Sequence, residues 1–556
     1  MSMLVVNSAL RSLLTWAILL VAGLLPTAVQ AQAPAWAWAL DFPNASISNV
    51  VPDRQGNIYI LGSFTGTVVA GNTTLTSSLF YPDVFVAKMD ATGNFLWATR
   101  TGGMSRDYPG GLGVDASGNP VVGMFFMDQV TFGSTTLTAS IHPLFGAFAV
   151  GKLNSADGTW RWATRFNYGF WPNPKMGVTA APNGDVLITG YLPTSNTQTT
   201  AYFGTISFPS MGGGDGYITR LDGNSGAFQW AVAAGGSGID AGTAVACDAN
   251  GNAYVTGRFS GTGTFGSYTL TSAGESDVYV AKLSPTGQWL WAVRGGGTSD
   301  DFGQGLALDG SGNTYVTGSF RNVATFGSHS VGQGTGANNF LFVAKFDDSG
   351  QCQWVANAGG GSSSGRNVVL DATGQVYVAG NGNSASMTLG AAPISGNGDT
   401  YVARLNPAGS WQWAVFGGGQ NGTQDVGLAQ DATGSAYVTG NFVTTATFGS
   451  TTLTQTSPYG AYVAKLSNQV LAARANAHAS EVMAWPQPAR AGQMLNLPVS
   501  GSAALTLYDA QGRQVFTTFV PVGAAQVLLP ATLTSGLYQL RLQDKMGRRQ
   551  GRLLLE

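Results

Sequence analysis

Apolar and polar residues alternate along most of the chain in short runs that are typical of β-strands. The clearest run, DANGNAYVTGRF at 248–259, returns as DGSGNTYVTGSF at 309–320 and as DATGSAYVTGNF at 431–442. A period of two with Val, Tyr and Thr predicts a strand, and the Asp-x-x-Gly step before it predicts a tight turn capped by the aspartate. Looser copies, which bring the number to seven, stand at 53–64, 115–126, 181–192 and 371–382.

A second alternating run follows each of these copies and carries a Lys or Arg before its last apolar residue. DVYVAKLS at 277–284 and FLFVAKFD at 340–347 are two examples. Each run is bounded by Gly, Asp, Asn or Ser, which predicts another strand between turns. The other copies, which again make seven, are at 83–90, 146–154, 215–222, 399–406 and 460–467.

A third, tryptophan-rich run completes each repeat, but only six copies stand inside the array. They lie at 95–98, 160–163, 228–231, 289–292, 352–355 and 411–414, and their second tryptophans are 59 to 68 residues apart. The missing copy is WAWA at 36–39, near the start of the chain. A closed ring gains from such a split repeat, because the first strand can pair with the last repeat, beside residues 461–466. We therefore expect Trp36 and Trp38 to close the ring, with both indoles on one face of their strand.

These motifs resemble the family of seven-bladed β-propeller (SBBP) repeats, whose unit carries an aspartate, GNxYVTG and a following FVAKL strand. The resemblance covers residues 36–470 and implies a fold without an activity. The expected fold is all-β: a seven-bladed β-propeller over 32–471, closed by an N-terminal strand. Each blade has four strands, from an inner one such as 304–309 to the outer Trp strand. A Thr-rich segment such as 446–454 is expected to lengthen a hairpin or form a side ribbon.

The first residues are typical of a secretory signal peptide over 1–31. Arg11 supplies a positive charge, 12–25 is apolar, and Val29, Gln30 and Ala31 form a small-x-small cleavage site. The apolar run is shorter than the roughly 20 residues that span a bilayer, so we expect no transmembrane segment in the mature chain.

The C-terminal part has a different pattern and the opposite charge. After a Pro-punctuated linker at 472–484, residues 485–556 alternate in strands of about five to eight residues and predict a small immunoglobulin-like β-sandwich. They hold seven Lys/Arg against three Asp/Glu, whereas 32–484 hold 18 against 25.

This tail resembles the C-terminal sorting domain of type IX secretion. The motifs are PQP at 486–488, LYDAQGRQV at 507–515, LTSGLYQLRL at 533–542 and GRLLLE at 551–556, although Gln487 stands where the family has Asn. The resemblance implies secretion machinery as a partner, export across the outer membrane of a Gram-negative cell, and a secreted or surface-attached protein. In that family the tail is often removed and the protein attached to lipopolysaccharide.

Composition and motifs disfavour most enzyme and nucleic-acid functions. The formal net charge is -2, so no field for a polyanion is built into the chain. The three histidines, at 142, 329 and 478, stand at no metal-ligand spacing, and neither a Gly-x-Ser-x-Gly elbow nor a phosphate loop occurs. We expect no metal and no cofactor. Cys247 and Cys352 fall on an inner and an outer strand of neighbouring blades, too far apart for a disulfide, and are expected to be buried free thiols.

The candidate ligand-binding residues gather in the loops that lead into the inner strands. Three aspartates recur there, each eight residues before a repeat aspartate or its equivalent. Such loops open on one face of a propeller, where they can hold a cation or a sugar, or can simply be solvated. The residues are Asp107, Asp240, Asp301, Asp300, Arg106, Arg366 and Asp425.

The leading hypothesis is therefore an exported, monomeric, non-catalytic propeller that presents loops for adhesion or for binding a surface glycan or protein. A rival is a secreted polysaccharide-active enzyme, which would need two carboxylates within about 5 to 10 Å. A third hypothesis is a structural surface-layer component.

Overall fold

The structure is a computed structural model in which every described regular element is a β-strand. The chain divides into two compact units, Met1–Val470 and Leu471–Glu556. The predicted signal peptide and the predicted linker lie outside the described residues. The structure describes 34–78, 81–139, 146–169, 175–193, 200–332, 338–383, 385–392, 394–419, 426–455, 457–467, 488–497, 502–509, 513–522, 524, 526–544 and 547–556.

In the described part of the first unit, seven antiparallel sheets contain the same set of four strands in the same order. The order runs from an innermost strand through a second and a third to an outer strand. The innermost strands are β2 (Ala45–Pro52), β8 (Asp107–Val114), β14 (Gly177–Ala180), β20 (Ala241–Cys247), β26 (Phe302–Leu308), β33 (Ser363–Leu370) and β39 (Gly427–Gln430). The second strands are β3 (Ile58–Phe64), β9 (Pro120–Met127), β15 (Val186–Leu192), β21 (Ala253–Phe259), β27 (Thr314–Phe320), β34 (Val376–Gly382) and β40 (Ala436–Phe442).

The third and outer strands are the Lys/Arg-bearing and tryptophan-rich runs of the sequence. The third strands are β6 (Asp83–Met89), β12 (Gly146–Leu153), β18 (Asp215–Leu221), β24 (Asp277–Leu283), β30 (Phe340–Phe346), β37 (Thr400–Leu405) and β43 (Gly460–Leu466). The outer strands are β7 (Phe95–Thr101), β13 (Trp160–Gly169), β19 (Phe228–Gly236), β25 (Trp289–Gly296), β31 (Cys352–Asn357), β38 (Trp411–Gly417) and β1 (Trp36–Pro43).

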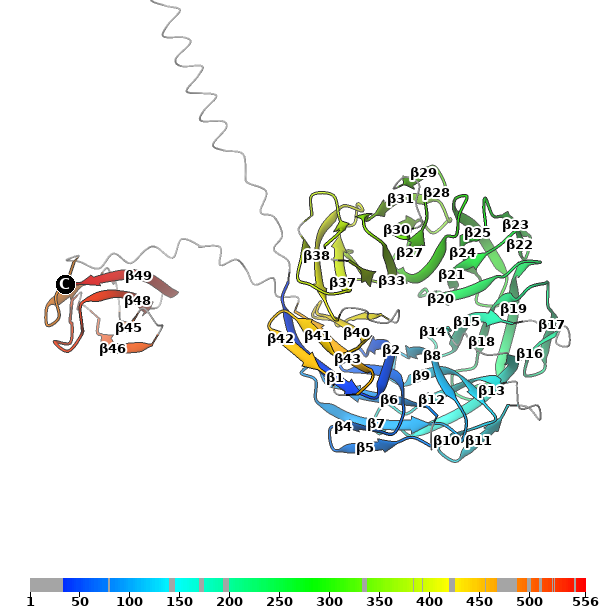
Figure 1. The fold of residues 1–556 in the computed structure, drawn as a ribbon, viewed down its shortest axis with the longest axis horizontal. Helices are drawn as coiled ribbons and strands as arrows, with labels where there is room; N and C mark the ends of the chain where they lie inside the picture. The colour runs from blue at the N-terminus through cyan, green and yellow to red at the C-terminus, as the bar shows by residue number, and fades with distance from the viewer. Residues whose placement is uncertain are drawn as a thin grey trace, which may run out of the picture. The chain divides into compact units, whose positions relative to one another are not determined.

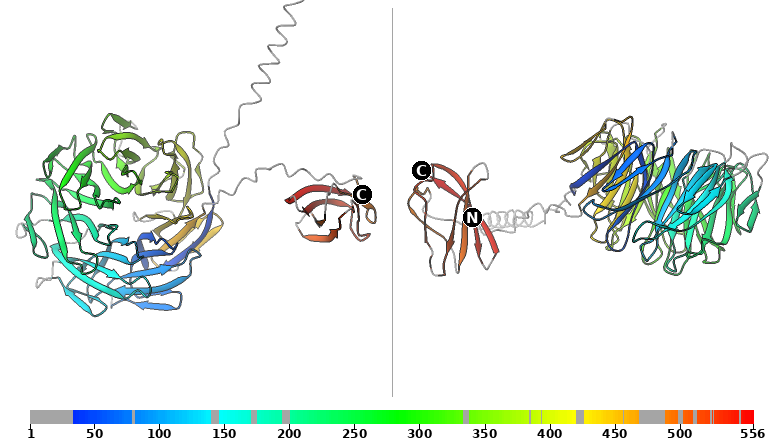
Figure 2. Two further views of the ribbon diagram at one scale, coloured as in Figure 1. Left: turned by 180° about the vertical axis from the view of Figure 1, so that it is seen from behind. Right: turned by 90° about the horizontal axis from the view of Figure 1, so that it is seen from below.

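The sheets stand around a common centre, as in a β-propeller (Figures 1 and 2). Each innermost strand contacts the innermost strand of the following sheet, and β39 contacts β2. The N-terminal strand β1 pairs antiparallel with β43, from Trp36 opposite Leu466 to Pro43 opposite Gly460. The predicted pairing of 36–40 with 461–466 is therefore confirmed.

The Thr-rich segments form side ribbons that join neighbouring sheets. The ribbon β22–β23 (Thr262–Phe265, Tyr268–Thr271) pairs with outer strand β19 of the preceding sheet through Gly235 and Thr264. The sixth sheet carries β36 (Ile394–Ser395) beside β38, and β35 (Met387–Thr388) pairs with β32 (Gly359–Gly360). The remaining ribbons are β4–β5 (Thr67–Ala70, Thr73–Thr76), β10–β11 (Gln129–Phe132, Thr135–Thr138), β16–β17 (Thr200–Phe203, Ile206–Pro209), β28–β29 (Val323–Phe326, His329–Gly332) and β41–β42 (Thr445–Phe448, Thr451–Thr454).

The two tryptophans of the closing strand lie on opposite faces, so the expectation of one shared face is wrong. The register between β1 and β43 shifts between Trp36 and Trp38, which marks a β-bulge. Trp36 packs on Phe448 in the core between the sixth and seventh sheets, and Trp38 packs on Tyr437 in the core between the seventh and first. Because of the bulge, this one strand contributes a tryptophan to each of the two cores.

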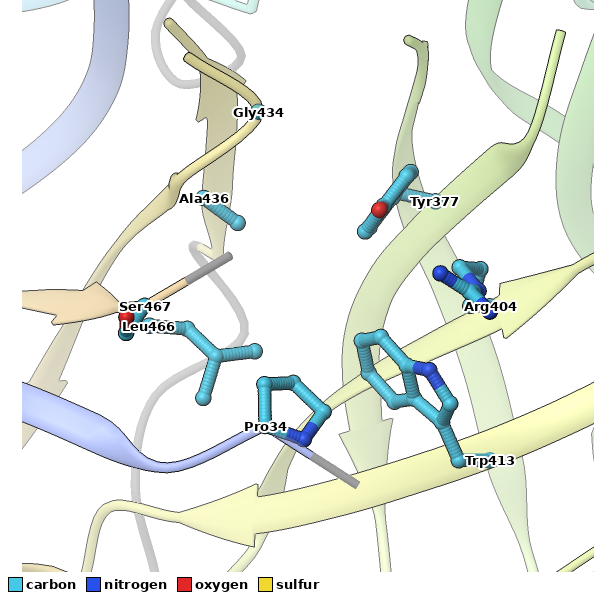
Figure 3. A pocket seen from close by; sticks show the side chains of 8 residues that line it. All are labelled: Pro34, Tyr377, Arg404, Trp413, Gly434, Ala436, Leu466 and Ser467. Atoms are coloured by element: carbon cyan, nitrogen blue, oxygen red, sulfur yellow. The ribbon is translucent and has the colours of Figure 1, made fainter. Parts of the chain in front are cut away.

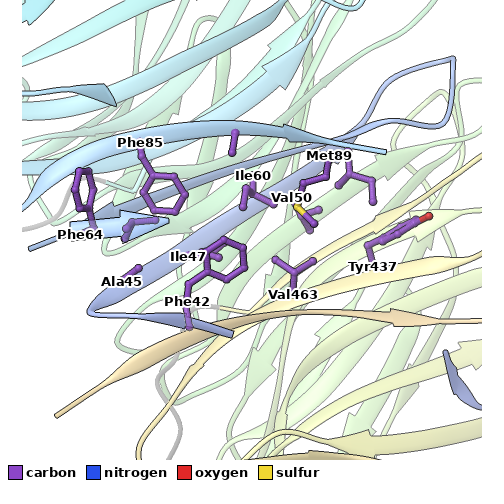
Figure 4. Packing of buried hydrophobic residues seen from close by; sticks show 14 of the residues in the cluster. Phe42, Ala45, Ile47, Val50, Ile60, Phe64, Phe85, Met89, Tyr437 and Val463 are labelled. Carbon is purple, nitrogen blue, oxygen red and sulfur yellow. The ribbon is translucent and has the colours of Figure 1, made fainter. Parts of the chain in front are cut away.

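The first and last sheets share a continuous apolar core (Figure 4). Phe42 of the N-terminal strand packs against Phe85 of the first sheet, with ring centroids 6.4 Å apart. Val463 and Tyr437 enter the same core from the seventh sheet. Burial of large side chains here contributes about 1.5–3 kcal/mol each, which explains how the two ends of the array hold together.

The recurring glycine of the VTG motif is required by close packing inside each sheet. A Cβ on Gly318 would lie 1.8 Å from the carbonyl oxygen of Phe302, and one on Gly257 would lie 1.9 Å from that of Ala241. No side chain fits at such a distance, so glycine lets the second strand approach the innermost strand.

The repeat aspartates cap their own hairpin turns, as predicted. Asp53 Oδ1 accepts hydrogen bonds from the backbone amides of Gln55 and Asn57, both at 2.9 Å. A lysine of the third strand adds an ion pair at several of these turns, such as Lys152 with Asp115 at 2.8 Å.

The second unit contains two sheets. One pairs β44 (Met494–Asn496) with β47 (Gln526–Leu528), and the other has the order β46 (Gln514–Val520), β45 (Ala503–Tyr508), β48 (Gly536–Asp544) and β49 (Gly547–Leu555). Apolar side chains of both sheets, among them Leu495, Leu505 and Leu540, share one buried core.

Candidate functional site

The candidate residues lie at one end of the sheets, which we call the loop face. Here the loops that enter the innermost strands meet the loops that enter the third strands of the preceding sheet. The amide of Asp301 donates to the carbonyl of Ser276 at 2.8 Å, and the amide of Asp240 donates to that of Gly214 at 2.9 Å. At the opposite end, the turn face, the strands are joined by the tight aspartate turns. The loop face is therefore a frame of loops tied to one another by backbone hydrogen bonds.

The three recurring loop aspartates are buried, so neither ligand contact nor solvation describes them. Asp107, Asp240 and Asp301 are each 0% exposed. Asp301 accepts from the amide of Gly297 at 2.6 Å and from that of Arg321 at 3.1 Å. Asp240 accepts in the same way from Gly236 at 2.7 Å and Ser260 at 3.0 Å, and Asp107 from Gly103 at 2.8 Å. These carboxyl groups fold their own loops instead of reaching a ligand.

We call these three loop aspartates the clamps. A second buried carboxyl group faces each clamp. Asp277 opens the third strand of the fourth sheet, and its Oδ2 pairs with Arg294 Nη1 at 2.6 Å. A Cβ on Gly296 would lie 2.7 Å from Asp277 Oδ1 and 2.8 Å from Asp301 Oδ2, so both carboxyl groups converge on this glycine. The matching pairs are Asp83 with Asp107 and Asp215 with Asp240.

Burial sets the protonation of these pairs. Desolvation raises the pKa of Asp107 to about 8, that of Asp301 to about 7 and that of Asp240 to about 6, and the second carboxylate adds to each rise. In the part of the chain that the structure describes, Asp83 Oδ1, Asp107 Oδ1 and Asp277 Oδ1 are buried without a hydrogen-bond partner. A polysaccharide cannot reach carboxyl groups that are at most 1% exposed, so these pairs are not suited to glycosidic chemistry.

The charged residues next to the clamps are more accessible. Arg106 is exposed, and its guanidinium carbon lies 5.4 Å from the ring centroid of Tyr81, which is 42% exposed. Asp300 is half-buried beside Asp301. Asp425 lies outside the described residues. Arg106 with Tyr81 offers the cation and aromatic surface that bound ligands commonly contact.

Arg366 belongs to a cluster of side chains at the inner rim of the ring. The sequence did not predict this cluster. Arg366 Nη1 donates to Gln304 Oε1 at 2.8 Å, and Lys175 Nζ donates to the same oxygen at 3.3 Å. These residues come from the sixth and fifth sheets and from the loop that enters the third. We call Lys175, Gln304 and Arg366 the rim cluster. It brings two cationic side chains to one amide oxygen.

A β-bulge in the innermost strand explains how the rim cluster is positioned. The registers of β26 and β33 shift around Gln304 and Arg366, so each is an extra residue whose side chain is turned out of the ladder. Both stand five residues before their repeat aspartates, as do Ser48 and Thr243 in other bulges. That fixed offset is the signal that could have identified Gln304.

A groove of about 370 Å³ lies on the turn face between the fourth and fifth sheets. Its lining includes Asp248, Asp309, Asp348 and Lys282, and Lys282 Nζ lies 2.5 Å from Asp348 Oδ1. Cys247 also lines it.

Cys247 and Cys352 are free thiols, as predicted, although each is half-buried rather than buried. In the described ranges, no three His, Cys, Asp or Glu side chains converge as metal ligands would. The same residues contain no helix with the length and apolarity to span a bilayer.

Comparison with known proteins supports the propeller architecture. A family model described as beta-propeller repeat matches residues 291–319. No curated protein matches the chain.

Solved structures are similar only at low identity. A quinohemoprotein alcohol dehydrogenase from Comamonas testosteroni is 11% identical with a TM-score of 0.34, over 78% of this chain and 77% of that one. A protein of unknown function from Dyadobacter fermentans is 11% identical with a TM-score of 0.35, over 65% and 94%. A europium-containing methanol dehydrogenase is 12% identical with a TM-score of 0.33, over 78% and 93%. Similarities of this size carry no argument about activity.

Proposed function

We propose that this protein is an exported, non-catalytic, seven-bladed β-propeller that binds an acidic surface glycan through its loop face. The observation that carries the proposal is that the buried and the accessible charged residues of the loops have different roles. The buried aspartates hold the loops, which leaves Arg106 exposed over Tyr81 and places Arg366 and Lys175 at the rim. A rigid frame with accessible cations and an aromatic ring favours a ligand with carboxylate or sulfate groups.

A glycan array on the mature protein tests this function. Acidic polysaccharides should bind and their neutral counterparts should not. Arg366→Gln should weaken binding about tenfold or more, because a charge-assisted hydrogen bond contributes about 1.5–3 kcal/mol. Asp348→Asn, on the turn face, is the matched control and should leave binding unchanged. Hydrolysis of any bound glycan would instead favour the rival, a polysaccharide-active enzyme, and regular self-assembly without a ligand would favour a surface-layer component.

The proposal includes the route of export. An N-terminal signal peptide over 1–31 and an immunoglobulin-like sorting domain over 485–556 would carry the chain through a type IX secretion system to the outer surface as a monomer. The two-sheet architecture of the second unit supports this assignment.

Deletion of 485–556 tests the route in a Gram-negative host that has this system. The full chain should reach the medium or the cell surface, whereas the deleted chain should stay in the periplasm in folded form, because the two units have separate cores. Equal export of both chains would contradict the assignment of the tail.

A further inference from the structure

A pair of hydrogen-bond donors recurs where neighbouring sheets meet at the turn face. The cation of a third strand and the second tryptophan of the outer strand donate to one carbonyl in the next sheet. Lys88 Nζ and Trp97 Nε1 both donate to the carbonyl of Ser155 at 3.1 Å. Lys152 and Trp162 share the carbonyl of Gly223 in the same way, at 2.9 and 3.2 Å. The acceptor always lies in the turn between the third and outer strands.

The same tryptophan bond is found at three further interfaces. Trp230 donates to the carbonyl of Pro285 at 2.9 Å, and Trp291 donates to that of Asp348 at 2.9 Å. Trp354 donates to the carbonyl of Pro407 at 3.2 Å. The sixth sheet carries the equivalent donors, Arg404 and Trp413. Its neighbour, the seventh sheet, has no turn between third and outer strands, because its outer strand β1 comes from the N-terminus.

The donors of the sixth sheet are consequently left without acceptors. Trp413 is 2% exposed, and among the described residues its Nε1 has no hydrogen-bond partner. Arg404 Nε is also buried and unpartnered, and the guanidinium carbon lies 5.6 Å from the indole centroid. A buried donor without a partner costs about 1–3 kcal/mol, so an acceptor placed here would be bound favourably.

A small cavity lies where the acceptor would be, and we call it the seam pocket. Its volume is about 10 Å³, which is room for one oxygen-sized atom. Arg404, Trp413 and Tyr377 line one side, and Pro34, Leu466 and Ser467 line the other (Figure 3). Arg404 is the only charged residue among the eight that line it, so the pocket is positive and rich in donors.

We propose that the seam pocket binds the carboxylate group of a small organic acid. One carboxylate oxygen would fill the cavity and accept from Trp413 Nε1 and Arg404 Nε, while the second oxygen faces outward. A planar guanidinium suits a carboxylate better than a neutral carbonyl, because the hydrogen bonds are charge-assisted. The proposal does not depend on the loop face, which lies at the other end of the sheets.

Indole-¹⁵N NMR of the mature full chain tests the seam pocket with two acidic probes, acetate and glucuronate, and a neutral one, methyl glucoside. The Trp413 signal is identified by its loss in Trp413→Phe, which keeps an apolar ring in place. Acetate and glucuronate should shift this signal to saturation, and methyl glucoside should not. Arg404→Gln should weaken the response at least tenfold, and Arg404→Lys should weaken it less.

The signal of Trp354 is the internal control, because its N–H is already bonded to Pro407. It should not move in any titration. No shift of Trp413 with either acid would mean that water or the chain itself fills the pocket, and the proposal would be wrong. An equal response to methyl glucoside, or an unchanged response in Arg404→Gln, would also overturn it.

Discussion

Deletion of residues 36–40 should open the ring and lower the melting temperature by roughly 10 °C or more. The deleted segment removes most of the strand that pairs with β43 and takes Trp36 and Trp38 out of two different cores. Loss of a fully buried tryptophan costs about 3–5 kcal/mol, and loss of these two partly buried ones costs less each. Loss of the strand pairing adds to this cost, and each kcal/mol lowers the melting temperature by at most about 2–4 °C. Circular dichroism melts of the deleted and parent mature chains measure the effect.

A permuted chain provides the matched control. Residues 36–43 are moved behind Ser467 and joined through a copy of the turn at 406–410, so that the seventh sheet is built like the sixth. This chain should recover the parent's melting temperature, and the new turn should supply Trp413 with the carbonyl it lacks. A deleted chain that melts like the parent would mean that the ring is closed by another segment, such as VLAAR at 470–474.

Closure of the ring by the N-terminal strand could be predicted from the sequence, because it follows from the number of copies of each strand motif. Seven copies of two strands and six of a third leave one strand missing, and only WAWA supplies it. The faces of Trp36 and Trp38 could not be predicted in the same way. A strict period of two puts both on one face, whereas the bulge between them breaks the period, and nothing in a four-residue motif marks an extra residue.

The sequence analysis identified the loop aspartates, but it interpreted them as ligand-binding or solvated side chains, and neither interpretation fits their burial. A charged residue in a loop is usually solvated, and the sequence does not show that loops of adjacent sheets cover one another. A signal was nevertheless present. Asp107, Asp240 and Asp301 each follow a Gly-Gly pair, with the second glycine four residues earlier, and that glycine donates the amide that each carboxyl accepts.

The rim cluster lay beyond sequence reasoning for a different reason. Arg366 was identified because it is a loop-proximal charge, but Lys175 and Gln304 are 129 residues apart. Only the closed ring brings the third and fifth sheets near enough for their side chains to meet.

The parent should lose stability as pH rises, and the substitution Asp107→Asn should remove a large part of that loss. The pKa of Asp107 is about 8 in the folded protein, against an ordinary 3.8. Between about pH 4 and 8 the folded chain therefore holds a proton that the unfolded chain has lost, so the free energy of unfolding falls as pH rises through this window. The full effect is on the order of a few kcal/mol, since each pKa unit is worth about 1.4 kcal/mol.

Urea melts at pH 5, 7 and 9 measure this effect. Asn has no proton to lose and keeps an oxygen for the amide of Gly103. The variant should match the parent near pH 5 and be more stable at pH 9. Asp107→Ala leaves the Gly103 amide unpaired and should be less stable than Asp107→Asn at every pH.

Asp300→Asn removes a charge from a half-buried loop side chain that makes the smallest contribution to the raised pKa of Asp301, so it should change the profile far less than Asp107→Asn does. Asp240 and Asp301 retain raised pKa values in the Asp107→Asn variant, so some pH dependence should persist until all three clamps are replaced. If the parent and Asp107→Asn lose stability in parallel from pH 5 to 9, the buried carboxyl at 107 is not the group that titrates. The loops would then be held by an ionised clamp, whose negative charge would be balanced by Arg100, the residue that forms an ion pair with the neighbouring Asp83.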